Sequence, residues 1–470
     1  MKVYFRNSLK ALVLLSIIFS LNSCKDKEEV EPPIVAEDSP NVAVNKWIKD
    51  VMDEVYFWLD DMKTPIASSS DPEDYYESLL FRPTDRFSAI YPDYQELINS
   101  LQGINKEAGY EFSLVRESNE NENVLAFVTY IKKGSPAASK DIRRGDVINQ
   151  INGQSMNLNN YRTLLGQIGD SHSITFLRYN AVTGQYSAQA PVSLETVSLA
   201  ENPNFLDTVY TINNQKIGYA VYHFFAPGID GQPTRYDDQA DEIFAKFKAE
   251  GINHLILDFR YNGGGFVSSA VNLASLIAPN VKSTDVFSKT KYNSFLMSFS
   301  QFQNNNTPFK NKSQNLGPIL SGNKIYIITS SRTASASELI INGLKPYMDV
   351  VVIGGRTVGK NVGSIALEDE ENPKNNYGIL PIVTRSFNSL DQSDYGNGFP
   401  ADVEGNELSQ PVLLPLGDTN EYLLKLAIGK ITAQPSGRMN LVDRLDIGSS
   451  MESKVRFGRM IEENIELFDK

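Results

Sequence analysis

The sequence predicts a mixed α/β protein, and two observations carry this prediction. Residues 200–435 alternate between short apolar runs, typical of buried strands, and helical patterns. Residues 104–196 instead form a series of short strands separated by glycine- and asparagine-containing turns. The chain has 470 residues, which is too long for one compact domain, so we expect two or three.

Composition narrows the classes of function. The net charge of −13 argues against nucleic acid or an anionic membrane surface as the main partner. Hydrophobic residues make up 41% of the chain, which is ample for packed cores. A single cysteine excludes an internal disulfide framework, and three histidines argue against a His-rich metal site. We expect no metal and no organic cofactor.

The first residues have the pattern of a signal peptide. Lys2, Arg6 and Lys10 precede the apolar run 11–21, which is too short to span a bilayer. The segment 1–23 ends in Leu21-Asn-Ser-Cys24, which resembles a bacterial lipoprotein lipobox. The resemblance implies a lipidated Cys24 that anchors the protein in the cell envelope, in the outer membrane, on its periplasmic or its outer side. The alternative is an ordinary secretory signal with a chance cysteine.

Residues 24–41 are rich in charge and contain proline, which is typical of a flexible tether. We expect a helical N-terminal region to follow at residues 42–100. In residues 42–62, Trp47, Val51, Val55 and Trp58 recur at helical spacing, and a second short helix is predicted from Pro72 to Leu80. We expect the aromatic stripe to pack in a core rather than to bind a partner.

Residues 104–196 carry the pieces Gly134-Ser-Pro-Ala-Ala138, Gly145-Asp-Val-Ile148 and Ile151-Asn-Gly153. Their order resembles a PDZ domain of bacterial proteases. That resemblance implies a module that adds a peptide C-terminus to its sheet as a strand. The candidate peptide-binding residues lie in the loop 108–112 and are Gly109, Tyr110 and Phe112. A purely structural or gating PDZ domain is the alternative.

The predicted strand Leu255–Arg260 runs into Tyr261-Asn-Gly-Gly-Gly265 and then into a helix over 267–277. A glycine run after a strand can present backbone N–H groups to a ligand. No Lys-Ser or Lys-Thr pair follows these glycines, so a nucleotide-binding P-loop does not fit.

A second strand, Ile325–Thr329, leads into Thr333-Ala-Ser-Ala-Ser-Glu338, which opens a helical pattern. Ser335 would lie at the helix start, where free N–H groups favour developing negative charge. None of the three histidines is near this turn in sequence, whereas Lys360 follows in a Gly-flanked loop.

Together, Asp258–Gly265, Thr333–Glu338 and Gly359-Lys360, with Gly396–Asp402, resemble the C-terminal processing peptidases, also called tail-specific proteases. The resemblance covers roughly residues 70–405. It implies Ser335 as the nucleophile and Lys360 as the general base, 25 residues later. It also implies an oxyanion hole made by the N–H groups of Ala336 and Gly264.

Two further residues are assigned to the catalytic site. Glu338 shares a helix face with Ser335. As an anion near the amine it would raise the pKa of Lys360, so we expect its hydrogen bonds to be directed elsewhere. Many bacterial members of the family have glutamine four residues after the lysine, and here that position is Ser364.

Other assignments remain open. Ser337 is a competing nucleophile, and a Ser-His arrangement would use His223. A peptidase core at 200–435 leaves a C-terminal extension, 436–470, in which a helix is predicted over 455–468 and no chemistry is identified.

We predict a lipid-anchored serine-type endopeptidase with a Ser-Lys dyad. It would act on envelope or extracellular proteins and bind them through their C-termini at the PDZ domain. The alternative is a catalytically weak or inactive binding lipoprotein on the same fold. A third possibility keeps Lys360 displaced until a peptide fills the PDZ domain.

Overall fold

The computed structural model describes residues 40–118, 121–434 and 442–463. The predicted signal peptide, Cys24 and all but the end of the tether lie outside the described residues. Within these ranges, no helix combines the length and the apolar character needed to cross a bilayer.

The N-terminal region contains α1 (Pro40–Val55), α2 (Pro72–Leu79) and α3 (Tyr94–Leu101). The first helix was predicted to continue to residue 62, but it ends at Val55 because the chain then turns and the Phe57 N–H donates to the Ile382 carbonyl, 2.8 Å away. Trp47 and Trp58 are partly buried and pack against the hydrophobic cluster that contains the buried face of α1, so the prediction of a core role for this stripe is confirmed.

The PDZ region is one large antiparallel sheet in the order β24-β3-β4-β5-β7-β8, with the short helix α4 (Tyr161–Leu165) against it. Its strands are β3 (Tyr110–Arg116), β4 (Val124–Ile131), β5 (Val147–Ile151), β7 (His172–Asn180), β8 (Gln185–Ala188) and β24 (Leu445–Ser449). The edge strand β24 comes from the far C-terminal part of the chain, which the sequence reading did not anticipate.

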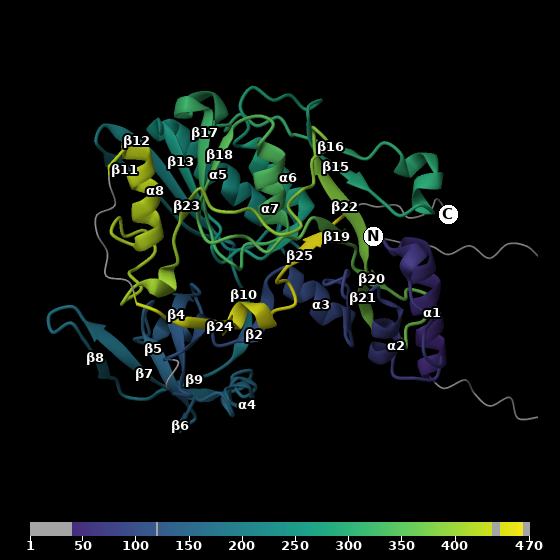
Figure 1. Ribbon diagram of the computed structural model, residues 1–470, viewed down its shortest axis with the longest axis horizontal. Helices are drawn as coiled ribbons and strands as arrows, with labels where there is room; N and C mark the ends of the chain where they lie inside the picture. The colour runs from purple at the N-terminus through teal and green to yellow at the C-terminus, as the bar shows by residue number, and fades with distance from the viewer. Residues whose placement is uncertain (1–39, 119–120, 435–441, 464–470) are drawn as a thin grey trace, which may run out of the picture.

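The core of the fold is a six-stranded sheet, β11-β12-β13-β17-β18-β23, in which all neighbours except β11 and β12 are parallel. Its strands are β11 (Asn204–Ile212), β12 (Gln215–Tyr222), β13 (His254–Asp258), β17 (Lys324–Thr329), β18 (Asp349–Gly354) and β23 (Val403–Glu404). The central strands are apolar along their length because both faces are covered. α5 (Arg235–Glu250), α6 (Val267–Ser275) and α7 (Ala336–Leu344) cover one face, and α8 (Tyr422–Thr432) covers the other (Figure 1).

A second six-stranded sheet, of mixed direction, runs β14-β25-β19-β22-β15-β16. Its strands are β14 (Gly264–Phe266), β25 (Arg459–Ile461), β19 (Val362–Ser364), β22 (Ile382–Asn388), β15 (Val286–Lys291) and β16 (Asn306–Pro308). The helix predicted over 455–468 is wrong for the described part of that range. Gly458 has φ 64°, which stops a helix, and the following residues pair with β14 as a strand.

Short strands complete the fold. They are β1 (Ala89–Tyr91), β20 (Leu367–Glu368) and β21 (Gly378–Leu380) in a three-stranded sheet, β2 (Ile104–Glu107) paired with β10 (Val197–Ala200), and β6 (Gln154–Ser155) and β9 (Val192–Leu194) at the PDZ sheet. In Figure 1 the PDZ sheet lies below the core and the N-terminal helices lie beside it.

Candidate active site

Three sequence motifs that are far apart in the chain meet because they follow three neighbouring strands. In the core sheet β13 pairs with β17, and β17 pairs with β18, all parallel. The glycine run 263–265 follows β13, the Ser335 turn follows β17, and Gly359-Lys360 follows β18. The carboxyl ends of parallel strands share one edge of a sheet, where α/β folds place their ligands.

Ser335 is held in a strained turn immediately before α7. Its backbone has φ 65° and ψ −118°, a conformation that residues other than glycine rarely adopt. The side chain is buried, and its hydroxyl oxygen has no hydrogen-bond partner among the residues that the structure describes. A strained, unpartnered serine at a strand-to-helix turn has the character of a nucleophile position.

Glu338 connects the serine turn to the lysine loop. Its buried carboxylate accepts hydrogen bonds from the N–H groups of Ser335 (2.8 Å), Gly359 (2.7 Å) and Lys360 (2.8 Å) and from the Thr357 hydroxyl (2.6 Å). Burial raises the pKa of Glu338, and these four donors oppose the rise. The carboxylate thus bonds the backbone of both loops and fixes the distance between them. It does not bond the Lys360 amine, as expected from the sequence.

Lys360 is fully buried, and its Nζ donates to the carbonyl of Gly458 over 2.7 Å. The amine also lies 5.0 Å from the centre of the Phe87 ring. Burial, and then the positive charge of Arg459, hold the pKa of Lys360 well below its usual 10.5, while Asp85 and Glu338 act in the opposite direction. A neutral amine in this position can accept a proton.

The two predicted oxyanion donors differ in their surroundings. Ala336 is the first residue of α7, so its N–H has no acceptor within the helix. The Gly264 N–H instead donates to Asn262 Oδ1 at 2.9 Å. Gly264 has φ 109°, and a side chain added there would meet the Ser335 Cβ at 2.6 Å. The glycine run therefore packs directly against the serine, with its Gly264 amide turned to Asn262 in this conformation.

Ser364 lies buried in β19, and within the described part of the chain its hydroxyl has no hydrogen-bond partner. It makes no bond to the Lys360 amine, whose acceptor is Gly458. The contacts of His223 are with other residues than those of the serine turn. Its Nδ1 lies 3.3 Å from Glu201, and its ring stacks on Phe205. Ser337 donates to the Asn262 carbonyl over 3.1 Å.

The predicted peptide-binding residues lie at the start of β3. The Phe112 N–H donates to the Ser450 hydroxyl at 2.9 Å, and the Tyr110 hydroxyl lies 2.9 Å from His172 Nε2. Gly109 has φ 86°, and its carbonyl accepts from the Lys132 N–H at 2.9 Å. Tyr110 and Phe112 pair with β4 on one side of β3, and on the other side the Phe112 N–H is bonded to the Ser450 side chain.

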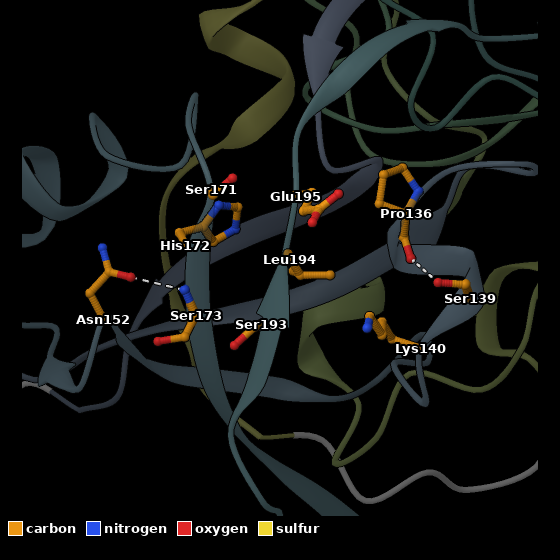
Figure 2. Close-up of a pocket in the computed structure, with 10 residues that line it drawn as sticks. All are labelled: Pro136, Ser139, Lys140, Asn152, Ser171, His172, Ser173, Ser193, Leu194 and Glu195. Carbon is orange, nitrogen blue, oxygen red and sulfur yellow. Dashed lines mark hydrogen bonds between the residues drawn. The ribbon is translucent and has the colours of Figure 1, made fainter.

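A surface hollow of the PDZ region lies nearby, lined by Ser139, Lys140, His172, Leu194 and Glu195 among others. Figure 2 shows the side chains that line it, which are mostly polar, with the Asn152 amide oxygen accepting from the Ser173 N–H. The lining is mixed in charge and is separate from the serine turn.

Sequence reasoning missed several residues at this site. Asn262 holds the glycine run through Gly264 and the neighbouring strand through the Tyr222 carbonyl, 2.8 Å away. Thr357 bonds Glu338, and Phe87 lies under the lysine amine. Asn262 stands inside the quoted motif 258–265, so its position beside the glycines was a usable signal. Gly458 had no such signal, because its role depends on a long-range strand pairing.

Three carboxylates, Glu107, Glu111 and Glu201, come close enough together to suggest a cation site. The Lys132 amine already occupies their centre, at 2.5, 2.9 and 2.8 Å from the three groups. An ammonium group therefore takes the place that a metal ion would need.

Comparison with known proteins identifies the families that parts of this chain match. Residues 216–396 match the family "Peptidase family S41", residues 43–89 match "Peptidase S41 N-terminal domain", and residues 127–178 match "PDZ domain". A putative S41 protease from Bacteroides fragilis has a similar crystal structure, with 26% identity, a TM-score of 0.68, and coverage of 82% of this chain and 97% of that one.

Curated relatives are more distant in sequence. A probable CtpA-like serine protease of Staphylococcus aureus is 22% identical over 312 residues, which are 66% of this chain and 56% of that protein. A probable CtpA-like serine protease of Staphylococcus epidermidis is 21% identical, over 71% of this chain and 61% of that protein. The match thus spans little more than half the length of these relatives.

Proposed function

This chain belongs to peptidase family S41 and contains a PDZ domain. On that premise we propose that it is a serine-type endopeptidase, with Ser335 as the nucleophile and Lys360 as the general base. The observation that carries the proposal is the pairing of a strained, unpartnered serine with a buried lysine of lowered pKa, on two loops joined by one carboxylate.

The reaction follows from these groups. Neutral Lys360 Nζ removes the proton from Ser335 Oγ as the oxygen attacks the peptide carbonyl. The resulting ammonium returns that proton to the leaving amine, which departs and leaves an ester on Ser335. Lys360 then takes a proton from water, the hydroxide attacks the ester, and the carboxyl product leaves as Ser335 recovers its proton.

Oxyanion stabilisation is assigned to the Ala336 N–H and to a glycine amide of the run 263–265. Each such donor contributes on the order of 3 kcal/mol in enzymes of this chemistry. The Gly264 amide must leave Asn262 to take this role, and the Lys360 amine must come within bonding reach of the Ser335 hydroxyl. The proposal therefore requires a local rearrangement before catalysis.

The substrate class is proposed from the domain plan. A PDZ sheet with its peptide-binding strand β3 near the core suits proteins captured by their C-termini. With a lipid anchor on Cys24, these substrates would be proteins of the cell envelope or its surroundings.

We expect activity to depend on pH through Lys360. Burial lowers the pKa of this amine, so the neutral base is present above that lowered pKa and is lost below it. The value of kcat/KM for a tailed peptide should therefore rise with pH, with a midpoint well below 10.5. Kinetics across the pH range in which circular dichroism shows a folded protein provide the measurement. A midpoint at the ordinary lysine value would contradict Lys360 as the base.

The proposed anchor gives a separate expected result. The variant Cys24→Ala should move from the membrane pellet to the soluble fraction and should lose labelling by an alkyne fatty acid, because a diacylated cysteine supplies most of the binding energy. Lys25→Ala is the matched control and should behave as wild type. A Cys24→Ala protein that still carries lipid would show that the anchor lies elsewhere.

An inactive peptide-binding protein is the second candidate. It is favoured by the Gly264 amide, which is bonded to Asn262, and by the Lys360 amine, which is bonded to Gly458. Covalent labelling of Ser335 by a fluorophosphonate probe separates the two, because only an activated serine reacts with it.

A further inference from the structure

One continuous segment of the chain contacts both the PDZ sheet and the candidate active site. After α8 and the residues that follow it, the chain returns along the PDZ sheet as β24 and then enters the core as β25. In Figure 1 this segment is the yellow ribbon that crosses from the PDZ sheet to the strands next to α7.

At the PDZ end the segment adds a strand to β3. Leu445 pairs with Arg116 and Ser449 pairs with Ser113, in antiparallel register, on the edge of β3 that β4 leaves open. The side chain of Ile447 packs against the PDZ core. Strand addition with one inserted apolar side chain is how PDZ domains hold peptides, and this strand belongs to the protein itself.

The next residues close the start of β3. The Ser450 hydroxyl accepts from the Phe112 N–H at 2.9 Å and donates to Glu111 at 2.5 Å. Phe112 is one of the residues assigned to peptide binding from the sequence. Its backbone donor is therefore already occupied by the segment.

Two basic residues of the segment then complete a buried ion cluster. Lys454 lies 2.6 Å from Glu107 and 3.0 Å from Glu111, and Arg456 lies 2.5 Å from Glu201. Without Lys454 and Arg456, the carboxylates of Glu107, Glu111 and Glu201 would have a single lysine partner, Lys132. Burial opposes ionisation of Glu111, yet Lys132 and then Lys454 hold its pKa at about 2. The surface under the segment is thus acidic and suits a basic occupant.

At the core end the segment covers the catalytic groups. Phe457 packs on Gly263, where an added side chain would meet its ring at 2.7 Å. The Gly458 carbonyl binds the Lys360 amine, and β25 pairs with β14, so that the Arg459 carbonyl lies against Gly264. Ser335, Ala336 and Lys360 are all fully buried.

We propose that residues 445–461 are an internal ligand: they occupy the β3 edge and its acidic cluster (Glu107, Glu111 and Glu201) and at the same time cover Ser335 and Lys360. The same surface binds an incoming polypeptide that can form a strand on β3 and supply basic side chains to the cluster, and this binding displaces the segment. The inhibitory half of this inference rests on the proposed function. The binding half does not.

The test uses full-length protein with a specific protease site inserted between residues 435 and 441, cut after folding. The freed C-terminal piece is removed in high salt and by size-exclusion chromatography, with mass spectrometry to confirm its loss. Binding of a fluorescent peptide of residues 442–463 is then measured by anisotropy in the Ser335→Ala background, which makes this readout independent of catalysis. A peptide with Lys454→Glu and Arg456→Glu is the charge-reversed comparison.

We expect the native peptide to bind and the charge-reversed peptide to bind about tenfold more weakly or worse, within the usual range of such couplings. In the protein that keeps the native Ser335, removal of the segment should raise the rate of fluorophosphonate labelling about tenfold or more. Adding the native peptide should bring the labelling rate back down.

An uncut double variant, Lys454→Glu with Arg456→Glu, provides the second route. Its segment should exchange amide hydrogens faster and its Ser335 should label faster, whereas Lys282→Glu with Lys374→Glu, two exposed lysines, should match wild type. A segment that stays protected and bound in both preparations would be a fixed part of the fold and would overturn the proposal.

A segment that leaves without faster labelling would overturn its inhibitory role. Peptide binding with no labelling of Ser335 in any form would instead contradict the proposed function alone and leave the internal ligand standing.

Discussion

Replacing Ser335 by alanine should lower kcat/KM for peptide cleavage by about 10⁴-fold or more, down to the residual rate that binding and the oxyanion donors alone support. Lys360→Met, which keeps an apolar side chain of similar length in the buried site, should lose a similar amount. Because the two groups act on the same proton, the double variant should be hardly worse than either single variant.

The measurement is steady-state cleavage of a C-terminally tailed peptide, with circular dichroism to confirm folding. Ser331→Ala is the matched control, an exposed serine just before the same turn, and should keep its activity. Ser337→Ala tests the competing nucleophile and should retain most of the rate. Strictly additive losses at Ser335 and Lys360 would contradict a shared catalytic step.

The largest expected loss of stability follows from Arg260. Its guanidinium is fully buried and bonds Asp258 at 2.7 Å, Glu421 at 2.6 Å and Glu407 at 2.9 Å. Arg260→Met would leave these carboxylates with too little positive charge, which typically costs 3–5 kcal/mol, with roughly that loss expected here. Because Arg260 stands three residues before the glycine run that begins at Gly263, cleavage should fall as well.

Urea unfolding measures this change, with Arg143→Ala as the control. Arg143 makes an exposed pair with Asp141, so its loss should leave the unfolding midpoint nearly unchanged. An Arg260→Met protein as stable as wild type would mean that other cations neutralise these carboxylates. Arg144, which lies 2.7 Å from Glu407, would be the first candidate.

The sequence was most informative where local pattern and packing agree. The apolar runs before 258 and 329 became β13 and β17, and the pattern after Ser335 became α7, because these elements are buried on both faces and have few alternatives. The parallel order of these strands then brings the motifs together.

The remainder depends on contacts between distant residues. β24 and β25 are short and carry no periodicity of their own, and they are strands because β24 pairs with β3 and β25 lies between β14 and β19. The end of α1 at Val55 is likewise fixed by a bond to Ile382. Glu338 could be placed on a helix face from its spacing, but its contacts to the lysine loop could not be read from the sequence.

One measurement tests the central claim most directly: identification by mass spectrometry of the residue that a fluorophosphonate modifies, in wild type and in Lys360→Met, with the reaction followed to completion. The account predicts a single adduct on Ser335 in the wild type and none in the Lys360 variant. An adduct on another serine, or one on Ser335 that forms equally well without the lysine, would contradict it.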